Sequence, residues 1–367
     1  MNNFIYLDHA ATTPLCEAAK KAIIEHLDDF GNPSSAHELG RKSRVLIEDA
    51  RERIAKCINA DPNNIYFTSG GSEANTWAMH YRTVLASHLE HHSIVPTRFY
   101  RNINSNGLVD MRSLGRAILS YCIEYGYPLD MFSCMAVNNE LGVIQDIKTM
   151  ARIAHDNGLL FHTDAVQALP HMRIDVKDVQ CDMLSAAGHK FGAPKGIGFL
   201  YTTVSMEPLI DGGKQEQGIR GGTENILGII SMAAALEDAV EHMEERNAHV
   251  KCLRDKLLDK LLQIPDSHLN GSLENRVPGN INIRFSGVSG AKLVTLCSLY
   301  GVYISSGSAC NEGISEPSHV LKAIGLTDDD ALSSVRITIG HENTEEEIDQ
   351  TADIITELVE RIRYDDE

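Results

Sequence analysis

The chain is poor in several features that would place a protein in a class at first sight. Its eight cysteines are scattered over 367 residues, no two are closer than twelve residues, and no CxxC pair occurs. Because zinc sites and disulfide frameworks need close or paired cysteines, we expect free thiols and no metal. The apolar runs, such as the one around residues 229–236, are far too short to cross a bilayer, so no membrane association is expected.

Basic residues are also scarce. The chain has 33 Lys and Arg against 51 Asp and Glu, a formal net charge of −18 at pH 7. Because nucleic-acid phosphates are bound by a basic face, this balance argues against a nucleic-acid partner. The first residues, MNNFIYLDHAATTP, contain neither a basic segment nor a long apolar one, and so predict no secretory or mitochondrial signal. Free thiols and the lack of a signal both favour the cytoplasm.

The pattern that is present predicts an α/β fold with a mostly parallel central sheet. Short apolar or β-branched runs alternate with longer stretches of helix-forming residues, and Gly, Ser, Asn or Asp closes most runs. Such alternation is typical of βα units. The strands predicted for this sheet are residues 65–68, 83–86, 131–137, 159–162, 183–186 and 197–201.

A long helical stretch leads from this region to a smaller α/β unit. Residues 226–264 are predicted to form one helix, apolar at first and then charged, as expected of a helix that runs between two bodies. We therefore predict a large domain of residues 15–245 and a small domain of residues 1–14 plus 246–367. A capping box of Thr344 and Glu347 predicts the start of the final helix. In the small domain we expect strands at 280–285, 302–304 and 335–339, a helix at 291–300 and a polar loop at 305–317.

Lys190 and Asp164 are candidates for cofactor chemistry. Lys190 interrupts small and apolar residues in MLSAAGHKFGAPKGIGFLY, so poor solvation should lower its pKa and make the amine a Schiff-base nucleophile. Asp164 follows the apolar run LLFHT, at the carboxyl end of a predicted strand, where ligands of open α/β sheets collect. A protonated pyridine nitrogen, as in pyridoxal phosphate, is one partner for such a carboxylate. Taken singly, each is more often an ordinary lysine or an ion-paired aspartate.

Other polar residues lie in or after predicted strands. In FTSGGSEA, residues 70–72 lie between a strand and a helix, where backbone N–H groups can bind a phosphate, although a plain βα turn is the commoner use of such residues. His91 could stack on an aromatic cofactor or move a proton near neutral pH. Asn139 and Gln167 are further candidates, and Arg336 is suited to bind a substrate carboxylate through two hydrogen bonds.

Cys310 lies in SSGSACNEG, a run of small and polar residues. This is not the setting of a core cysteine, so an exposed thiol is expected, and an exposed thiol is a candidate nucleophile. No base is adjacent in the sequence, so a harmless surface cysteine is an equally good interpretation of this segment alone.

Taken together, these segments resemble the pyridoxal-phosphate (PLP) cysteine desulfurases of the class V aminotransferase superfamily, in the group whose active thiol lies in an SSGSAC loop. The resemblance covers nearly the whole chain. It implies fold type I, a homodimer with its sites at the subunit interface, and delivery of sulfur for iron-sulfur clusters or thio-cofactors. The matching motifs, in order, are YLDHAATTP, GNPSSAH, SGGSEAN, LEHHS, VNNELG, HTDAVQ, GHKFGAPKGIG, RGGTEN, SSGSAC, EPSHVLKAIG and VRITIG.

The resemblance also implies a role for each matching residue. Lys190 would hold PLP as a Schiff base, Asp164 would pair with the pyridine nitrogen, and Gln167 would reach the ring hydroxyl. His91 would stack on the ring, and Cys310 would take the sulfur of L-cysteine as a persulfide and leave L-alanine. The other implied contacts are to the cofactor phosphate, from Gly71, Ser72, His189 and, across the dimer, Thr223, and to the substrate carboxylate, from Arg336 and from Asn139, which would also contact the cofactor.

The chain departs from the family pattern at two positions and in length. Ala187 stands where the family commonly has a phosphate-binding hydroxyl, and Gln217 stands where it usually has arginine. Only 18 residues separate Glu73 from His91, where the family usually has a longer helix, and residues 95–105 replace what is usually a helix and a strand. Residues 121–128 are an unfamiliar segment. We therefore expect a large domain with trimmed outer layers in which every catalytic position is kept.

Three functions remain open from the sequence. The first is a working cysteine desulfurase, with a sulfur-acceptor protein as a further partner. The second is a class V lyase or aminotransferase acting on selenocysteine, cysteine sulfinate or another amino acid, in which Cys310 is incidental. The third is a non-catalytic sulfur-relay or partner scaffold. The presence of Lys190, Asp164 and Arg336 together argues against the third, because a scaffold has no use for a Schiff-base lysine.

Overall fold

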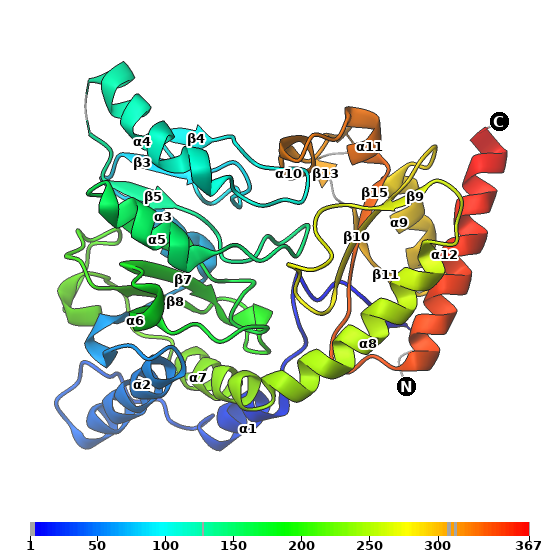
Figure 1. Ribbon diagram of the computed structural model, residues 1–367. Helices are drawn as coiled ribbons and strands as arrows, with labels where there is room; N and C mark the ends of the chain where they lie inside the picture. Colours follow the sequence, from blue (N-terminus) through cyan, green and yellow to red (C-terminus); the bar gives the residue numbers. More distant parts are fainter. Residues whose placement is uncertain (1–3, 127, 307–309, 312–313, 367) are drawn as a thin grey trace.

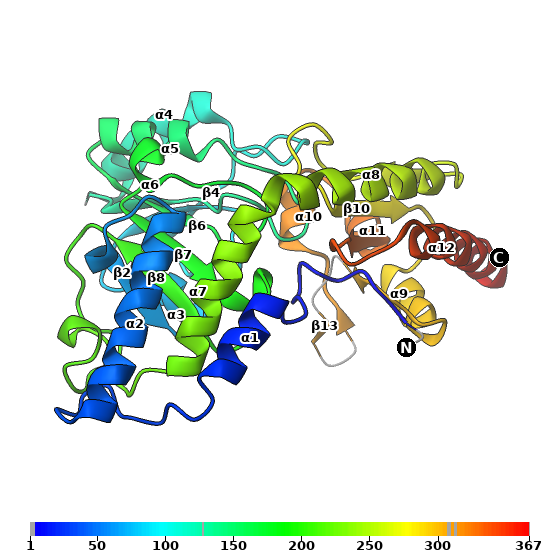
Figure 2. The ribbon, with the colours of Figure 1, turned by 90° about the horizontal axis from the view of Figure 1, so that it is seen from below.

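The computed structural model describes residues 4–126, 128–306, 310–311 and 314–366. A seven-stranded sheet flanked by helices lies beside a smaller antiparallel sheet (Figure 1). Helices α7 (Ile226–Glu241) and α8 (Met243–Leu261) follow each other from the larger sheet to the smaller one along one side of the molecule (Figure 2). The two sheets are therefore bridged by this pair of helices.

Many of the helices begin at a side-chain cap. Asp146, Asn225, Ser289 and Thr327 each accept a hydrogen bond from a backbone N–H of the first turn, which satisfies a donor that has no partner within the helix. The remaining helices are α1 (Glu17–Glu25), α2 (Glu38–Cys57), η1 (Pro62–Asn64), α3 (Gly71–Met79), α4 (Met111–Tyr125), α5 (Ile147–Asp156), α6 (Val176–Val179), η2 (Gly188–Lys190), η3 (Glu216–Gly218), α9 (Gly290–Leu299), α10 (His319–Ala323), α11 (Asp328–Leu332) and α12 (Glu345–Asp366).

The larger sheet has the strand order β2-β8-β7-β6-β5-β3-β4, and β8 runs antiparallel to both of its neighbours. The other strands of this sheet run in one direction, so their carboxyl ends meet along one edge. Its strands are β2 (Ile65–Thr68), β3 (Val84–Ser87), β4 (Arg98–Tyr100), β5 (Met131–Ser133), β6 (Leu160–Asp164), β7 (Met183–Ala187) and β8 (Gly198–Thr202).

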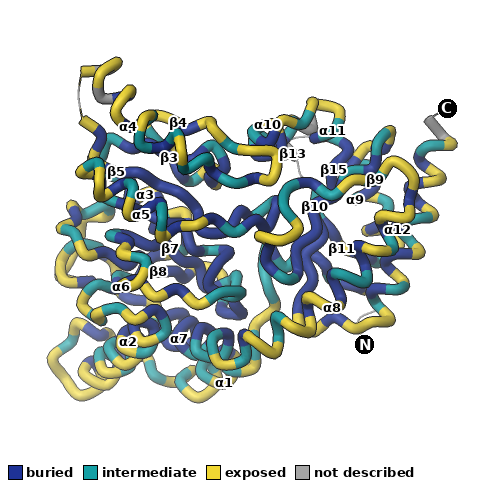
Figure 3. Tube along the Cα trace, viewed as in Figure 1, coloured by how far each residue is buried: buried dark blue, intermediate teal, exposed yellow. Residues whose placement is uncertain are grey.

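Successive side chains of these strands point to opposite faces of the sheet, and each face packs against its own hydrophobic core. Phe132 and Phe161 belong to the core that includes α2, α5 and α7, whereas Met131 and Met183 belong to a separate core with α3. The central strands are accordingly buried along their length (Figure 3). Each fully buried phenylalanine contributes about 1.5–3 kcal/mol relative to an exposed one.

The smaller sheet is antiparallel with the order β12-β15-β10-β9, and it pairs Asn282 with Arg336. The hydrophobic core beside this sheet consists of Ile5, Leu7 and apolar residues from Val250 onward. On this basis we propose the division into domains of 15–245 and of 1–14 plus 246–367. The strands of this part are β1 (Ile5–Tyr6), β9 (Ser267–Leu269), β10 (Asn280–Phe285), β11 (Val302–Tyr303), β12 (Ser305–Ser306), β13 (Cys310–Asn311), β14 (Ile314–Ser315) and β15 (Ser334–Thr338).

All six strands predicted for the larger sheet are present, but the predicted set was incomplete. The strand predicted at 131–137 is wrong in its second half, since β5 ends at Ser133. Strand β4 was missed because it is a three-residue edge strand with exposed Arg98 and Phe99, and so lacks the pattern of a buried strand. Within residues 95–105, all of them described, β4 is accompanied by no helix.

The single helix predicted over 226–264 is wrong. The helix ends at Glu241, His242 has φ −98° and ψ 9°, and a second helix starts at Met243. The break arises where the chain leaves one core for the other, because α7 packs in the first and α8 in the second. The predicted polar loop at 305–317 was also too simple, since β12 joins the smaller sheet and β13 pairs with β14.

The capping box predicted for the final helix is confirmed. The backbone N–H of Glu347 donates to Thr344 Oγ1 at 3.3 Å, and the backbone N–H of Thr344 donates to the Glu347 carboxylate at 3.1 Å. Among the described residues, no helix has both the length and the apolar character needed to cross a bilayer.

Candidate active site

The carboxyl ends of β2, β3, β6 and β7 surround a cavity of about 330 Å³. The N-terminal segment and strand β15 close it from the other side. Its wall is formed by Ala10, Ala11, Gly71, Ser72, Asn75, His91, Ser93, Met135, Asn139, Asp164, Val166, Gln167, Ala187, His189, Lys190 and Arg336.

Lys190 lies in η2, directly after β7. Its ammonium group donates to the backbone carbonyls of Ala10 at 2.6 Å and Ala11 at 2.7 Å. Burial, assisted by the charge of Arg336, lowers the pKa of Lys190 to about 8, and the charges of Asp164 and Asp8 oppose this shift. A substantial neutral fraction of this amine therefore exists near pH 8, as a nucleophile of carbonyl groups requires.

Asp164 ends β6 and is almost completely buried. One carboxylate oxygen accepts from Asn75 Nδ2 at 2.7 Å, and the other accepts from the backbone N–H of Val166 at 2.9 Å. Burial raises the pKa of Asp164, while these hydrogen bonds and the charges of His91 and Lys190 oppose the rise. A cation placed in the cavity against this carboxylate would favour its ionised form.

His91 is joined to Asp164 through Asn75 and Ser93. The Asn75 amide also donates to Ser93 Oγ at 2.9 Å, and Ser93 binds His91 Nδ1 through its hydroxyl at 2.8 Å and its backbone N–H at 3.1 Å. Because Nδ1 accepts from the Ser93 N–H, we assign the ring proton to Nε2. Burial lowers the pKa of His91, so the ring that lines the cavity is neutral near pH 7.

Sequence reasoning missed Asn75, although a signal was available. Asn75 lies four residues after Gly71 and three after Ser72 on α3, so helical spacing puts it on the same face as the predicted phosphate-binding turn.

The part of the cavity wall formed by Gly71, Ser72 and His189 is suited to an anion. Gly71 begins α3, and a Cβ there would lie 2.9 Å from Val166 Cγ2, so glycine lets the helix N-terminus lie this close to the segment that follows β6. Ser72 and His189 line the same part of the wall, and His189 Nδ1 lies 3.1 Å from Thr12 Oγ1. Burial lowers the pKa of His189 to about 4, so it acts as a neutral hydrogen-bonding group. Ala187 also lines the cavity, and an alanine side chain supplies no hydroxyl for a phosphate.

Arg336 extends from β15 of the smaller sheet into the cavity. Its guanidinium donates to the backbone carbonyl of Asn139 at 3.0 Å and to Asp8 Oδ1 at 2.7 Å. Gln167 donates to the carbonyl of Ala10 at 2.8 Å. Asp8 was not predicted as a site residue. The carboxylate of Asp8 fixes the orientation of the Arg336 guanidinium, the group suited to bind a substrate carboxylate.

The structure does not bring Thr223 to this cavity, and it does not describe the side chain of Cys310. Thr223 is exposed and does not line this cavity. Its segment is fixed to α3 by Arg220, which donates to Glu73 at 2.9 and 3.1 Å. The backbone of Cys310 forms β13, but its side chain lies outside the part of the chain that the structure describes. Gln217 is exposed and donates to the carbonyl of Asn63, away from the cavity.

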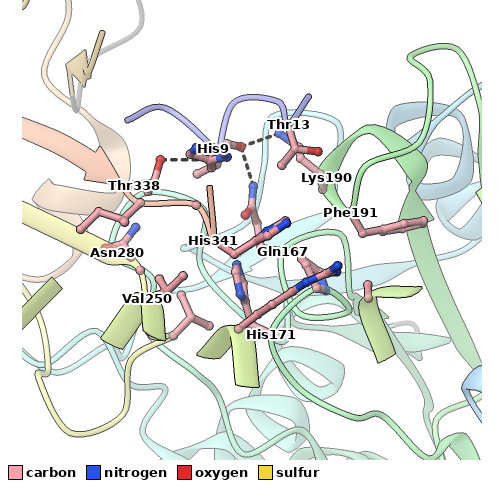
Figure 4. Close-up of a pocket in the computed structure, with 18 of the residues that line it drawn as sticks. His9, Thr13, Gln167, His171, Lys190, Phe191, Val250, Asn280, Thr338 and His341 are labelled. Carbon is pink, nitrogen blue, oxygen red and sulfur yellow. Dashed lines mark hydrogen bonds between the residues drawn. The ribbon is translucent and has the colours of Figure 1, made fainter. Parts of the chain in front are cut away.

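A second cavity, of about 100 Å³, also has Lys190 in its wall (Figure 4). His9, His171 and His341 line it, and it shares Gln167 and Lys190 with the first cavity. Ala10 lines both cavities, and its backbone carbonyl accepts the hydrogen bonds from Gln167 and Lys190. Asp164 and Gly71 line the first cavity and not the second, so the first has the donor set of a cofactor site.

Comparison with known proteins agrees with this geometry. The Aminotransferase class-V family matches residues 5–351, so the chain belongs to this family. Cysteine desulfurase IscS of Methanosarcina thermophila is 38% identical over 99% of this chain and 93% of its own length. The NifS-like protein of Rickettsia africae superposes with a TM-score of 0.90 at 30% identity, covering 97% of this chain and 99% of that one. SspA in complex with cysteine superposes with a TM-score of 0.77 at 32% identity, covering 92% and 99%.

The residues present fit PLP, the cofactor of this family. A half-neutral lysine amine suits its aldehyde, the buried Asp164 suits its pyridine nitrogen, and the close approach of α3 at Gly71 suits its phosphate. The imidazole of His91 is part of the wall of the same cavity. Lys190, Asp164, His91, Gln167 and the Gly71 turn would hold the cofactor.

Proposed function

We propose that the protein is a PLP-dependent cysteine desulfurase, which converts L-cysteine to L-alanine and takes the sulfur onto Cys310. The observation that carries the proposal is the single cavity in which an amine of lowered pKa, Lys190, lies with the buried carboxylate of Asp164 and the carboxylate-binding arginine Arg336. Relatives that bear this activity in their names align over nearly the full chain, and the solved relative SspA holds cysteine.

PLP, when bound, supplies an electron sink for the bonds of the substrate's Cα. The protein's own residues do the rest. Arg336 and Asn139 would hold the substrate carboxylate, and His91 would stack on the cofactor ring. Lys190 takes and returns the Cα proton once its amine is free. In the overall exchange the carbon–sulfur bond of L-cysteine breaks, an S–S bond forms at Cys310, and the thiol proton of Cys310 leaves with L-alanine.

We also propose that the enzyme is a homodimer in which Thr223 reaches the phosphate site of the partner subunit. Thr223 is exposed and absent from its own cavity, while Arg220 and Glu73 hold its segment beside α3. Large apolar side chains are exposed on α1 and the turn after it, where Ile24 is 73%, Leu27 63% and Phe30 83% exposed. A patch of this kind suits a protein partner, here a second copy.

We infer a cytoplasmic role in supplying sulfur for iron-sulfur clusters or thio-cofactors through an acceptor protein. The cysteines whose side chains are described are free thiols, as a reducing compartment would keep them, and the persulfide of this reaction is suited to onward transfer. The free cysteines are Cys16, Cys57, Cys134, Cys181, Cys252 and Cys297.

The test is mass spectrometry of Cys310 after the protein is mixed with PLP and L-cysteine, with L-alanine measured in parallel. One added sulfur on Cys310 and release of alanine are expected, and Cys310→Ala should bind PLP but form no persulfide. Undiminished turnover by Cys310→Ala would instead indicate a lyase with an incidental thiol. A wild-type protein that binds no PLP would leave only the scaffold function.

A further inference from the structure

Glu140 connects the active-site cavity to the segment that follows Cys310. It comes directly after Asn139, which lines the cavity. Its carboxylate accepts a hydrogen bond of 2.5 Å from Ser318 Oγ. Its backbone carbonyl accepts from Asn280 Nδ2 and Asn282 Nδ2, both at 3.2 Å, on strand β10 of the smaller sheet. One residue next to the substrate site thus makes side-chain and backbone contacts with the other domain.

Ser318 is the N-cap of α10. Its Oγ accepts from the backbone N–H groups of Val320 at 3.1 Å and Leu321 at 3.3 Å while it donates to Glu140. The position of Ser318 therefore sets where α10 begins. Ser318 lies eight residues after Cys310 and three after the end of β14, the strand that pairs with the Cys310 strand.

Further contacts seat α10 on the large domain. The imidazole of His319 bonds the backbone carbonyl of Glu90 at 3.0 Å, beside His91. Val320 and Leu321 belong to one apolar cluster with Leu89 and Leu141 of the large domain. The carboxylate of Glu140 adds a second polar contact to this area, beside that of His319, and Glu140 directly follows Asn139.

The environment of Glu140 is costly for a carboxylate. Burial raises the pKa of Glu140 to about 7, while the hydrogen bond from Ser318 and the charge of Arg336 oppose the rise. Glu140 is half-buried and lines no part of the cavity, so we explain its position by the Ser318 hydroxyl that it holds.

We propose that Glu140 is a positioning residue for the sulfur-transfer step. By holding Ser318 it fixes the start of α10, and with it the anchor of the Cys310 segment, relative to the loop that receives the substrate carboxylate. This inference rests on the proposed desulfurase function. Glu140 does not touch the substrate, so it should affect sulfur transfer to Cys310 and leave cofactor and substrate binding intact.

The test uses the full-length PLP-loaded protein and the variants Glu140→Ala, Glu140→Gln, Ser318→Ala and the double alanine variant. PLP content and the absorbance change on adding L-cysteine report binding, and mass spectrometry in a single turnover reports persulfide on Cys310. Each alanine variant should form persulfide about tenfold more slowly with unchanged binding. The double variant should be no slower than either single variant, because both remove the same hydrogen bond. Glu140→Gln should restore the rate, because its amide oxygen still accepts from Ser318.

Thr327→Ala is the matched control. Thr327 caps the adjacent helix α11 through the N–H of Asp330 but is exposed to solvent, so it measures the loss of a helix cap alone and should keep the wild-type rate. The inference is overturned if Glu140→Ala forms persulfide at the wild-type rate, if Glu140→Gln is as slow as Glu140→Ala, or if the rate falls only in proportion to PLP content. Absence of persulfide in the wild-type protein would instead refute the proposed function.

Discussion

Asn75 uses both N–H groups of its side-chain amide, one on Asp164 at 2.7 Å and one on Ser93 at 2.9 Å. Through Ser93 the same amide is linked to His91. The carboxylate expected to pair with the pyridine nitrogen of PLP and the imidazole expected to stack on its ring therefore share one support on α3. Their relative placement depends on a residue that need not touch the substrate.

Replacing this support should weaken cofactor binding. In Asn75→Ala, Asp164 loses a hydrogen bond that stabilises its charged form, which is worth about 1.5–3 kcal/mol. We expect PLP to bind roughly tenfold to a hundredfold more weakly, as measured by titrating the cofactor-free protein and following absorbance. Asn63→Ala, which removes an exposed amide bonded to Asp61, is the control and should bind PLP normally. Normal affinity in Asn75→Ala would contradict the supporting role.

The lowered pKa of Lys190 predicts how cofactor uptake depends on pH. A lysine with a pKa of about 8 is largely protonated at pH 7 and largely neutral at pH 9, and only the neutral amine attacks an aldehyde. The rate at which cofactor-free protein becomes covalently loaded should therefore rise about tenfold from pH 7 to pH 9 and then level off. The measurement is the amount trapped by borohydride at short times. A rate still rising steeply at pH 10 would indicate an ordinary lysine, and Lys190→Ala should trap none.

Arg336 should determine substrate affinity. Asp8 and the Asn139 carbonyl hold its guanidinium in one orientation, and a lysine cannot reproduce that planar fork. Arg336→Lys should raise KM for L-cysteine about tenfold or more, by loss of a charged hydrogen bond, and leave PLP content unchanged. Arg53→Lys, on the distant surface of α2, is the control. An unchanged KM in Arg336→Lys would place the substrate carboxylate elsewhere.

The ion pair of Arg51 and Glu216 should be important for stability. Arg51 donates to both carboxylate oxygens of Glu216 at 2.8 and 2.9 Å, and both side chains are almost fully buried next to β2. Arg51→Met leaves an unpaired buried carboxylate and should lower the free energy of unfolding by about 3–5 kcal/mol. Urea unfolding measures the change. Lys21→Gln, in an exposed pair with Glu25, should lose less than about 0.5 kcal/mol, and equal effects would refute the distinction.

The parts of the site that the sequence predicted are those with a local signal. Lys190 and Asp164 follow buried strands, and Gly71 lies at a strand-to-helix turn, so the order of apolar and polar residues already indicates the sheet edge on which they lie. Thr344 and Glu347 cap their helix through contacts three residues apart. In each case the relevant partner is the neighbouring backbone or strand end.

The parts that could not be predicted depend on long-range pairs. Asn75 meets Asp164 from 89 residues away, Asp8 meets Arg336 from 328 away, and Ser318 meets Glu140 from 178 away. Periodicity indicates which face of an element is buried, but it does not indicate which polar side chain will meet another there. The break between α7 and α8 was missed for a related reason. It occurs where the chain passes from one hydrophobic core to the other, and the sequence pattern does not indicate to which core each part of the helical stretch belongs.

The sequence by itself determined the α/β pattern, the strand ends from which the catalytic side chains extend, and the kinds of groups available there. Only the tertiary structure decided which of those groups share hydrogen bonds, how deeply Lys190 is buried, and that Glu140 binds the cap of α10. The physical reason is range. Strand and helix patterns arise from neighbours along the chain, whereas a hydrogen bond of about 3 Å exists only after packing has brought distant segments into register.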